Sequence, residues 1–451
     1  MSQRQLFGTD GIRGQANLYP ITVEVMLALG RALAHSVHKP GHRGTIVIGK
    51  DTRLSGYALE QALAAGVCSM GADVRLLGPL PTPGVAYITR AIKADAGVMI
   101  SASHNAYHDN GIKIFGGDGF KLADAQELAL EKLILEPHFE SPLYDQIGKA
   151  KRINDATGRY GTHLHEILPL DFDLKGKKIV LDCANGAAYK VAPQVLTELG
   201  AEVIILGDRP NGININHQVG SLHPQAAQAM VRQTGASLGI VLDGDADRLV
   251  LIDEKGEIVL GDALLALLAV HLKVPTLVCT DMSNLALEKC LAEHGIKVER
   301  TNVGDRYVLE RLRAGGHTFG GEESGHLIFT NHGTTGDGLA GALMVLSLLQ
   351  KAQKPLSELK NIFKPMPRAI QNRPVPEKIP FEDLPNSTAL MQKIKADLSR
   401  NGRLFVRYSG TEKKLRILIE GPEQSEINSM AGQLADTIIG EIQTSLFRHS
   451  L

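Results

Sequence analysis

Hydrophobic and polar positions along the chain repeat three times in the same order. Each repeat begins with a short β-branched apolar run, which predicts a buried strand. A helical stretch such as Leu59–Val67 follows, then a second strand opened by a glycine, then a third strand that runs into a polar loop. The predicted strands are Thr45–Ile48, Lys178–Leu181 and Thr276–Cys279 for the first position, those opening at Gly71, Gly200 and Gly295 for the second, and Ala96–Ile100, Ser237–Leu242 and His317–Phe319 for the third.

Each repeat then returns along a short strand to a Gly-Asp pair and an apolar helix. The return strands are Ile112–Phe115, Leu249–Asp253 and Leu327–Thr330, and the pairs are Gly117-Asp118, Gly261-Asp262 and Gly336-Asp337. An aspartate carboxylate accepts from the free amides of a first helical turn, so each of these aspartates is predicted to be a helix N-cap. A return strand after a short loop must pair antiparallel, so each largely parallel sheet is expected to be mixed.

The fold class predicted from this pattern is α/β, with three similar three-layer α/β/α domains with mixed sheets plus a smaller α+β C-terminal domain. A length of 451 residues agrees with three or four domains. We expect domains at residues 1–155, 156–256, 257–368 and 369–451. A cluster of prolines predicts a stiff linker and hinge before the last one: Pro365, Pro367, Pro374, Pro376 and Pro380. The tail then contains strand-like runs at Leu404–Arg407 and Leu415–Glu420.

The charge and composition of the chain argue against nucleic acid or a membrane as its general partner. Lys plus Arg number 48 and Asp plus Glu 49, so nothing draws the whole chain to nucleic acid or to a membrane. The longest apolar runs, Ala263–Val270 and Leu339–Leu349, are shorter than the roughly 18–20 residues of a membrane helix and predict buried helices. The four cysteines have no C-x-x-C spacing, and the N-terminus has no secretory pattern. We therefore expect free thiols and a cytoplasmic protein.

Polar loops follow all three of the third strands. Ligands bind at the carboxyl edge of α/β sheets, so equivalent loops from three domains are predicted to converge on one cleft. The first loop is Ser101–Asn105. A serine is a useful nucleophile only when a neighbour takes its proton or cations stabilise its anion, and His104 adjoins Ser103 while Lys113 follows. The alternative is an ordinary polar turn.

The second loop, DGDADR, places carboxylates at alternate positions. Asp243, Asp245 and Asp247 are hard oxygen ligands of the kind that suits Mg²⁺. A calcium hand is the alternative, since Glu254 matches its twelfth position. That motif needs glycine at its sixth position, where this chain has Arg248, and the flanking LVLID is strand-like rather than helical.

Three further segments carry candidate chemistry. In GGEESGH, Glu322 and Ser324 could present an acceptor and a donor to sugar hydroxyls; the alternative is a glycine-rich surface turn. In the tail, RYSGTE and Arg416 form a candidate phosphate clamp, or else a solvated turn. The basic loops FGTDGIRG, KDTR and GDR are weak signals alone, and none matches the phosphate loop of nucleotide triphosphatases or the dinucleotide fingerprint.

Five motifs follow one another along the chain: FGTDGIRG, SASHN…DNGIK, DGDADR, GEESGH and RYSGTE…R. In this order they resemble the motifs of the α-D-phosphohexomutase superfamily, and the resemblance covers essentially the whole chain. The forms GTDGIRG, SASHN and GEESGH are most similar to bacterial members that act on glucosamine phosphates. The resemblance implies four domains that carry, in chain order, the phosphoserine loop, the metal, the sugar and the second phosphate.

The resemblance also implies a role for each motif. Ser103 corresponds to the serine that is phosphorylated in the active enzyme, and an oxygen of its phosphate would join the three aspartates on Mg²⁺. The other implied residues are Glu322 and Ser324 for sugar hydroxyls; Arg407, Ser409, Gly410, Thr411 and Arg416 for the phosphate that is not reacting; Arg13, His104 and Lys113 for the reacting phosphate; Lys113 and His326 for proton transfer; and Arg248 and Arg306 in support.

The implied activity is that of an isomerase that converts glucosamine 6-phosphate to glucosamine 1-phosphate. The route would pass through a phosphoserine enzyme and a 1,6-bisphosphate, toward UDP-N-acetylglucosamine and peptidoglycan precursors. Alternatives are the same relay on glucose or mannose phosphates, a phosphohydrolase, and a sugar-phosphate sensor without catalysis. A homodimer is left open.

Two residues depart from the pattern of the superfamily. Ala106 stands where SHN is usually followed by proline, and Lys413 stands where GTE is usually followed by proline. Both changes put the rigidity of a loop in doubt, and Lys413 could add charge to the phosphate clamp.

Overall fold

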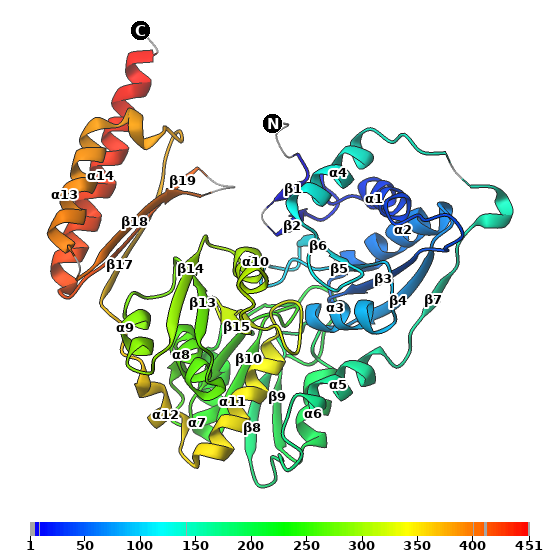
Figure 1. Cartoon of the computed structure of the whole chain (residues 1–451), viewed down its shortest axis with the longest axis horizontal. Coiled ribbons are helices and arrows are strands. Elements are labelled where there is room, and N and C mark those ends of the chain that lie inside the picture. The colour runs from blue at the N-terminus through cyan, green and yellow to red at the C-terminus, as the bar shows by residue number, and fades with distance from the viewer. Residues whose placement is uncertain (1–4, 9, 141, 400, 410–412, 450–451) are drawn as a thin grey trace. The chain divides into compact units, whose positions relative to one another are not determined.

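The computed structural model describes residues 5–8, 10–140, 142–399, 401–409 and 413–449, with side chains up to residue 447. The chain divides into two compact units (Figure 1). Unit 1 comprises residues 1–282 and 294–362, and unit 2 comprises residues 283–293 and 363–451. Within the described residues, every helix is too short or too polar to cross a membrane.

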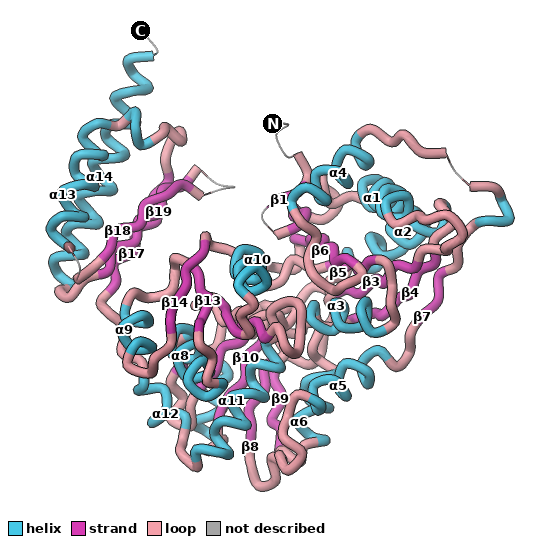
Figure 2. The backbone as a smooth tube through the Cα atoms, in the orientation of Figure 1, coloured by secondary structure: helices cyan, strands magenta, loops and turns pink. Residues whose placement is uncertain are grey.

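The first sheet of unit 1 has seven strands in the order β1-β2-β6-β5-β3-β4-β7. Its strands are β1 (Phe7–Gly8), β2 (Gly11–Gln15), β3 (Thr45–Lys50), β4 (Asp73–Pro79), β5 (Ala96–Ile100), β6 (Asp109–Gly116) and β7 (Ala150–Arg152). Helices α1 (Val23–Ser36), α2 (Ser55–Ser69) and α4 (Asp124–Leu135) share a core with alternate residues of β3, β5 and β6. Helix α3 (Thr82–Ala91) packs on the other face, where Gly49 and Gly97 leave room for Val85 and Thr89. In Figure 2, helices border the strands of this sheet on both sides.

The second and third sheets of unit 1 have the orders β12-β11-β10-β8-β9 and β14-β13-β15-β16. Their strands are β8 (Lys178–Asp182), β9 (Glu202–Leu206), β10 (Leu238–Leu242), β11 (Leu249–Ile252), β12 (Ile258–Val259), β13 (Thr276–Thr280), β14 (Lys297–Thr301), β15 (Phe319–Gly321) and β16 (Leu327–Phe329). Their helices are α5 (Ala156–Glu166), α6 (Val191–Glu198), α7 (Gln225–Thr234), α8 (Gly261–Leu272), α10 (Asp305–Gly315), α11 (Gly338–Ala352) and α12 (Leu356–Leu359). Short 3₁₀ turns lie at Tyr144–Gln146, Lys360–Ile362 and Phe381–Asp383.

All three sheets contain the same four-strand core. The orders β4-β3-β5-β6, β9-β8-β10-β11 and β14-β13-β15-β16 each place the first strand of the repeat between the second and the third. The first strand pairs parallel with both neighbours, and the third pairs antiparallel with the return strand. The predicted threefold repeat and mixed sheets are confirmed, as are the two buried apolar helices, which lie in α8 and α11.

The prediction that each Gly-Asp pair caps a helix is right for only one repeat. The carboxylate of Asp337 accepts from the N–H of Ala340 at 2.8 Å and caps α11. Asp262 lies inside the first turn of α8, and Asp118 lies in a turn ahead of α4, where it accepts from the N–H of Phe120. The same dipeptide therefore serves three local structures, because the distance from the hairpin to the helix differs.

Unit 2 is an antiparallel sheet, in the order β17-β19-β18, covered on one face by two helices. Its elements are β17 (Arg368–Pro374), β18 (Arg403–Tyr408), β19 (Lys414–Glu420), α13 (Pro385–Leu398), α14 (Gln424–His449) and the short α9 (Ala286–Ala292). The proline cluster was expected to be a linker, but part of it forms β17, which pairs with β19 along its whole length. Its proline is tolerated because it ends an edge strand. Segment 283–293 joins this unit through bonds such as that from the N–H of Leu285 to Glu420.

Candidate active site

The loops that follow β5, β10 and β15 meet in unit 1. The hydroxyl of Ser103 donates to Oδ2 of Asp243 at 2.6 Å, and both residues are buried. From the third loop, Nε2 of His326 lies 3.9 Å from Oδ2 of Asp247. Equivalent strand ends of the three repeats thus bring a serine, a group of carboxylates and an imidazole together.

Ser103 has a left-handed backbone with φ of 52°. Such a conformation is costly for a residue with a side chain and persists only when its surroundings impose it. The N–H of Ser103 donates to Oγ of Ser101 at 2.9 Å, and its carbonyl accepts from Arg53 at 3.0 Å and from Asn216 at 2.8 Å. Its hydroxyl also lies 3.2 Å from Nδ1 of His104. The backbone is therefore pinned on both sides while the hydroxyl faces the carboxylates.

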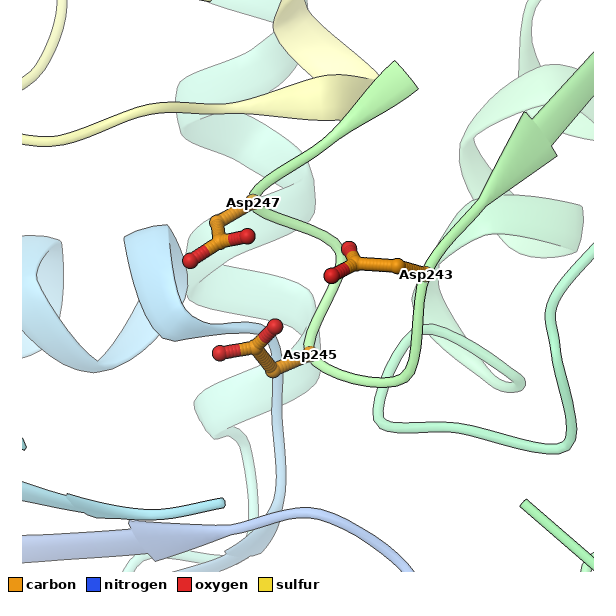
Figure 3. A group of neighbouring side chains, drawn as sticks. All are labelled: Asp243, Asp245 and Asp247. Carbon is orange, nitrogen blue, oxygen red and sulfur yellow. The ribbon is translucent and has the colours of Figure 1, made fainter. Parts of the chain in front are cut away.

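Three aspartates turn their carboxylates toward one another in the loop after β10 (Figure 3). One oxygen from each of Asp243, Asp245 and Asp247 lies within 4.8 Å of the others, and all three residues are buried. Burial and the charges of the other two carboxylates raise the pKa of Asp243 well above its ordinary value. Gly244 permits this loop to approach the serine loop, because a Cβ there would lie 2.5 Å from the carbonyl oxygen of Ser103.

Lys113, on β6, supplies a buried cation beside the aspartates. Its Nζ lies 2.8 Å from Oδ2 of Asp245 and 2.6 Å from Oδ2 of Asp247. Burial alone lowers the pKa of Lys113, but the carboxylates of Asp10, Asp245 and Asp247 outweigh it and raise that pKa well above the ordinary value. Burial alone raises the pKa of Asp245. The charge of Lys113 and a hydrogen bond from Thr82 outweigh burial and hold that pKa below its usual range.

The aspartate loop fits a divalent cation. Among the described residues, Oδ1 of Asp245 and Oδ1 of Asp247 are buried and have no hydrogen-bond partner. Buried carboxylate oxygens without a partner are costly, so they require a ligand that the protein itself does not provide. Three converging carboxylate oxygens are the donor set that Mg²⁺ prefers.

A second group of charges connects the serine domain to the third loop. Lys121 lies 2.8 Å from Asp10 and 2.5 Å from Asp305, whose carboxylate is 3.4 Å from Nε2 of His326. Burial would raise the pKa of Asp305, but Lys121 and His326 lower it to about 2. Arg13 forms an ion pair with Asp10 and donates to the carbonyl of Ala102. The reacting region is thus bordered by cations that carboxylates hold in place.

The remaining predicted residues of unit 1 fall in different settings. Glu322 is buried, accepts from the N–H of Gly304 at 3.1 Å and has a pKa raised by burial, whereas Ser324 is exposed. Burial and the positive charges of Arg248 and Arg13 lower the pKa of His104 to about 4. The N–H of Arg248 donates to Asp243.

Arg306, the expected supporting residue, contacts α4 and the segment before it. Its guanidinium donates to Glu127 of α4 at 3.1 Å and also contacts Asp124 and the carbonyl of Leu122. Asp305, its neighbour, is the residue that approaches His326. The start of α10 turns these successive side chains in different directions, and the GDR sequence alone does not show which one approaches the other loops.

In unit 2, Arg407 lies near the end of β18, Ser409 follows that strand directly, and Arg416 lies in β19. Arg407 and Arg416 are directly opposite each other in the β18–β19 ladder, on the face without helices. Burial and the charge of Arg416 lower the pKa of Arg407. Like charges in opposite positions destabilise a sheet, so this pair fits a site that receives an anion. Ser409 is buried nearby, and Gly410 and Thr411 lie outside the described residues.

The two departures from the proline pattern have structural consequences. The ammonium of Lys413 donates to the carbonyl of Pro376 at 3.0 Å, which joins it to the start of the tail. The carbonyl of Ala106 accepts from the buried guanidinium of Arg53, so a hydrogen bond restrains the serine loop at the position without a ring.

Sequence reasoning missed several residues that shape the site. They are Asp10, Asp51, Arg53, Thr82, Ser101, Lys121, Asn216 and Asp305. A signal did exist for KDTR, because Asp51 and Arg53 follow β3 and parallel strands such as β3 and β5 end at the same edge.

Comparisons with known proteins agree with this architecture. The chain matches four domain families: phosphoglucomutase/phosphomannomutase α/β/α domain I at residues 4–141, domain II at 159–256, domain III at 260–366 and the C-terminal domain at 371–437. Among solved structures, a phosphoglucomutase/phosphomannomutase family protein from Burkholderia thailandensis superimposes with a TM-score of 0.81 at 24% identity over 97% of each chain. An Aspergillus fumigatus N-acetylphosphoglucosamine mutase, in complex with GlcNAc-6P and magnesium, has a TM-score of 0.68 at 17% identity and covers 97% of this chain and 96% of its own.

Curated relatives are more similar. Phosphoglucosamine mutase of Anaeromyxobacter sp. (strain Fw109-5) is 53% identical over 447 residues, which cover 96% of this chain and 95% of the relative. Phosphoglucosamine mutase of Syntrophotalea carbinolica is 51% identical over 446 residues, or 97% of each protein. Both the four domain matches and the full-length identities lead to one conclusion: the chain belongs to the phosphoglucosamine mutase family within the phosphoglucomutase/phosphomannomutase group.

Proposed function

We propose that this protein interconverts glucosamine 6-phosphate and glucosamine 1-phosphate through phospho-Ser103. The observation that carries the proposal is the hydroxyl of Ser103, held 2.6 Å from Asp243 at the edge of a buried group of three carboxylates. Relatives named phosphoglucosamine mutase support the choice of sugar.

The proposed relay has two half-reactions. In the first, the bond between phosphorus and Oγ of Ser103 breaks and a bond to O1 of glucosamine 6-phosphate forms; the proton of the sugar hydroxyl leaves to a base, and Oγ is reprotonated. In the second, the 1,6-bisphosphate has turned around, the bond from phosphorus to O6 breaks and the bond to Oγ forms again; the proton of Oγ leaves to a base, and O6 is protonated. Glucosamine 1-phosphate leaves, and the enzyme is phosphorylated as it began.

The protein would contribute mainly positioning and charge neutralisation, which are the requirements of phosphoryl transfer. Lys113 and Arg13 would face the reacting phosphate, and His104 would lie beside Oγ, where its low pKa of about 4 keeps it neutral. Lys113, whose pKa is raised, suits the role of a fixed positive charge beside the phosphate. His326, whose Nε2 lies 3.4 Å from the carboxylate of Asp305, is the other candidate for proton transfer.

We propose Mg²⁺ as the cation that Asp243, Asp245 and Asp247 hold. When bound, it would neutralise charge on the phosphoryl oxygens. An oxygen of the Ser103 phosphate would be a further ligand. Titrating activity against Mg²⁺ after chelation tests the assignment, and Asp245→Asn should raise the Mg²⁺ concentration needed for half-maximal rate.

The domain roles follow from the same proposal. Residues 1–155 would carry the phosphoserine, 156–256 the metal and 257–368 the sugar through Glu322 and Ser324. Residues 369–451 would hold the other phosphate through the set Arg407, Ser409, Gly410, Thr411 and Arg416. The substrate would be a small phosphosugar used in the cytoplasm for amino-sugar precursors.

Two experiments test the function. Values of kcat/KM for the 6-phosphates of glucosamine, glucose and mannose decide the sugar, and equal values for all three would remove the preference for glucosamine. Incubation with a hexose 1,6-bisphosphate, followed by mass analysis of the peptide that contains Ser103, decides between an enzyme and a sensor. A sensor would bind the bisphosphate and leave the serine unmodified.

A further inference from the structure

Arg53 makes an unusual set of contacts with the serine loop. Its guanidinium donates to four backbone carbonyls of that loop, those of Ser103, Asn105, Ala106 and Asp109. The hydrogen bonds to Ser103, Asn105 and Asp109 have donor–acceptor distances of 2.9 to 3.0 Å. Among the buried side chains of the described residues, Arg53 is one of the largest, with no exposed surface.

The partner of Arg53 extends the same system to the amide of Ser103. Nε of Arg53 donates to Oδ2 of Asp51 at 2.8 Å, and that oxygen also accepts from the hydroxyl of Ser101 at 2.7 Å. Oγ of Ser101 in turn accepts from the N–H of Ser103. One ion pair therefore restrains the carbonyl of Ser103 directly and its amide through a single hydroxyl.

These restraints act on the torsion that decides where the hydroxyl points. With φ of 52°, Ser103 is in a conformation that its side chain disfavours, and relaxation toward ordinary φ would turn Oγ away from Asp243. No proline follows Asn105 to stiffen the loop, since residue 106 is alanine. Only a planar fork with several N–H groups can hold four carbonyls at once, and an ammonium cannot.

We propose that Arg53 is a positioning residue that holds the backbone of Ser103 in its left-handed conformation and so aims the phosphate-carrying oxygen at the aspartate loop. The inference rests on the proposed function, because it concerns the same serine. Arg53 acts through backbone carbonyls of residues 103–109, so its loss should change the rate of phosphate transfer and not the binding of the sugar phosphate.

Arg53→Lys is the informative variant, because it keeps a positive charge beside the buried Asp51 and removes the fork. We expect kcat to fall about 100-fold, the effect of misplacing a reacting group by about 1 Å, while KM for the sugar phosphate stays within a few-fold. The rate at which a hexose bisphosphate phosphorylates Ser103 should fall with kcat. Deuterium exchange should quicken in peptides covering residues 101–109 and stay unchanged in those covering β8 and β13.

Lys50→Met is the matched control. Lys50 is a buried cation on the same segment, but it pairs with Glu60 at 2.7 Å and not with the serine loop. The Lys50→Met substitution should lower thermal stability. The kcat of the folded fraction and the deuterium exchange of residues 101–109 should stay as in the wild type. Equal losses of kcat in both variants would show a general structural effect and overturn the proposal.

Further outcomes separate the proposal from its foundation. A folded Arg53→Lys enzyme with wild-type kcat and wild-type exchange at 101–109 overturns the role of Arg53 alone. A wild-type enzyme that never becomes phosphorylated at Ser103 overturns the proposed function instead. If Arg53→Lys does not fold, Ser101→Ala decides, because it removes the link to the amide of Ser103 with little change in volume; a wild-type kcat in that variant contradicts the proposal.

Discussion

The serine–aspartate region of unit 1 and the arginine pair of unit 2 are both charged, but they are built in opposite ways. Ser103, Lys113 and the three aspartates are each at most 2% exposed, and ion pairs and hydrogen bonds join them to other buried groups. Arg407 and Arg416 lie on the face of the three-stranded sheet that has no helices, where Arg416 is exposed and the residue opposite it in the ladder carries the same charge.

This difference indicates two tasks. A buried group whose members already face one another needs no rearrangement at the moment of reaction, which is how preorganised sites stabilise charge. Arg407 is half-buried and Arg416 is exposed, and their two guanidinium groups can both donate to an arriving anion. Chemistry in unit 1 and binding in unit 2 should therefore respond differently to substitution.

The largest expected effect is that of Ser103→Ala. The substitution removes the oxygen that would carry the phosphate, so we expect interconversion to fall to background while the chain stays folded. Mutase assays and thermal unfolding measure both. Ser36→Ala, which removes a hydroxyl bonded to the carbonyl of Leu33 on α1, is the matched control and should be fully active. Residual turnover in Ser103→Ala well above background would remove this serine from the mechanism.

Next in size is the pH dependence set by Asp337. Burial raises its pKa from 3.8 to about 6, so the folded state binds more protons than the unfolded state between those values. The contribution of Asp337 is full below pH 4, and the free energy of unfolding falls as pH rises through 6. Each pKa unit is worth about 1.4 kcal/mol, so the loss is on the order of 3 kcal/mol at neutral pH.

Asp337→Asn keeps an N-cap acceptor for α11 and cannot ionise. We expect the variant to be more stable than the wild type at pH 7.5 and equal to it near pH 4, as measured by the first thermal transition. Tyr160→Phe is the comparison: Tyr160 donates to Asp337 at 2.8 Å and so lowers the pKa of Asp337, and its loss should widen the pH range over which stability falls. A wild type that is more stable than Asp337→Asn at pH 7.5 would mean that its buried carboxylate is fully compensated.

Thr82→Val should have an intermediate effect, confined to the affinity of the proposed site for Mg²⁺. The hydroxyl of Thr82 donates to Oδ2 of Asp245 at 2.6 Å, and loss of such an outer partner typically weakens a metal site about 10–100-fold. The Mg²⁺ dependence of the rate measures this, and kcat at saturating Mg²⁺ should change little. Thr89→Val, on the same helix with its hydroxyl on the carbonyl of Val85, should leave the dependence unchanged. An equal shift in both variants would contradict the assignment.

The smallest expected effect is that of Arg416→Ala in unit 2. Loss of a charged hydrogen-bond donor should raise KM about 10-fold with kcat nearly unchanged, because such an arginine binds substrate and transition state alike. Arg373→Ala, in the same sheet opposite Leu415, is the control. A fall in kcat without a change in KM would assign Arg416 to the reacting phosphate.

Local pattern in the sequence was sufficient to predict the repeated strands and the loops that carry candidate chemistry. The apolar run Ala96–Ile100 is β5 without any change of boundary, and the runs at Leu249–Asp253 and Leu415–Glu420 are strands within one residue. The threefold repeat indicated that the three sheets share one strand order, because similar units pack their strands alike, but the order itself comes from the structure. It also determined which loops share an edge, and hence that Ser103, the three aspartates and His326 belong to one region.

Tertiary structure alone decided which of these polar residues pair. Arg53 reaches carbonyls about 50 residues away, and Lys121 reaches Asp305 across 184 positions, so no local pattern contains either contact. It also decided that neither Asp118 nor Asp262 is the N-cap of its helix, that the proline cluster includes an edge strand and that Arg306 contacts α4. The physical reason is that backbone hydrogen bonding and side-chain periodicity act over a few residues, whereas the pairing of buried charges depends on which surfaces are packed together.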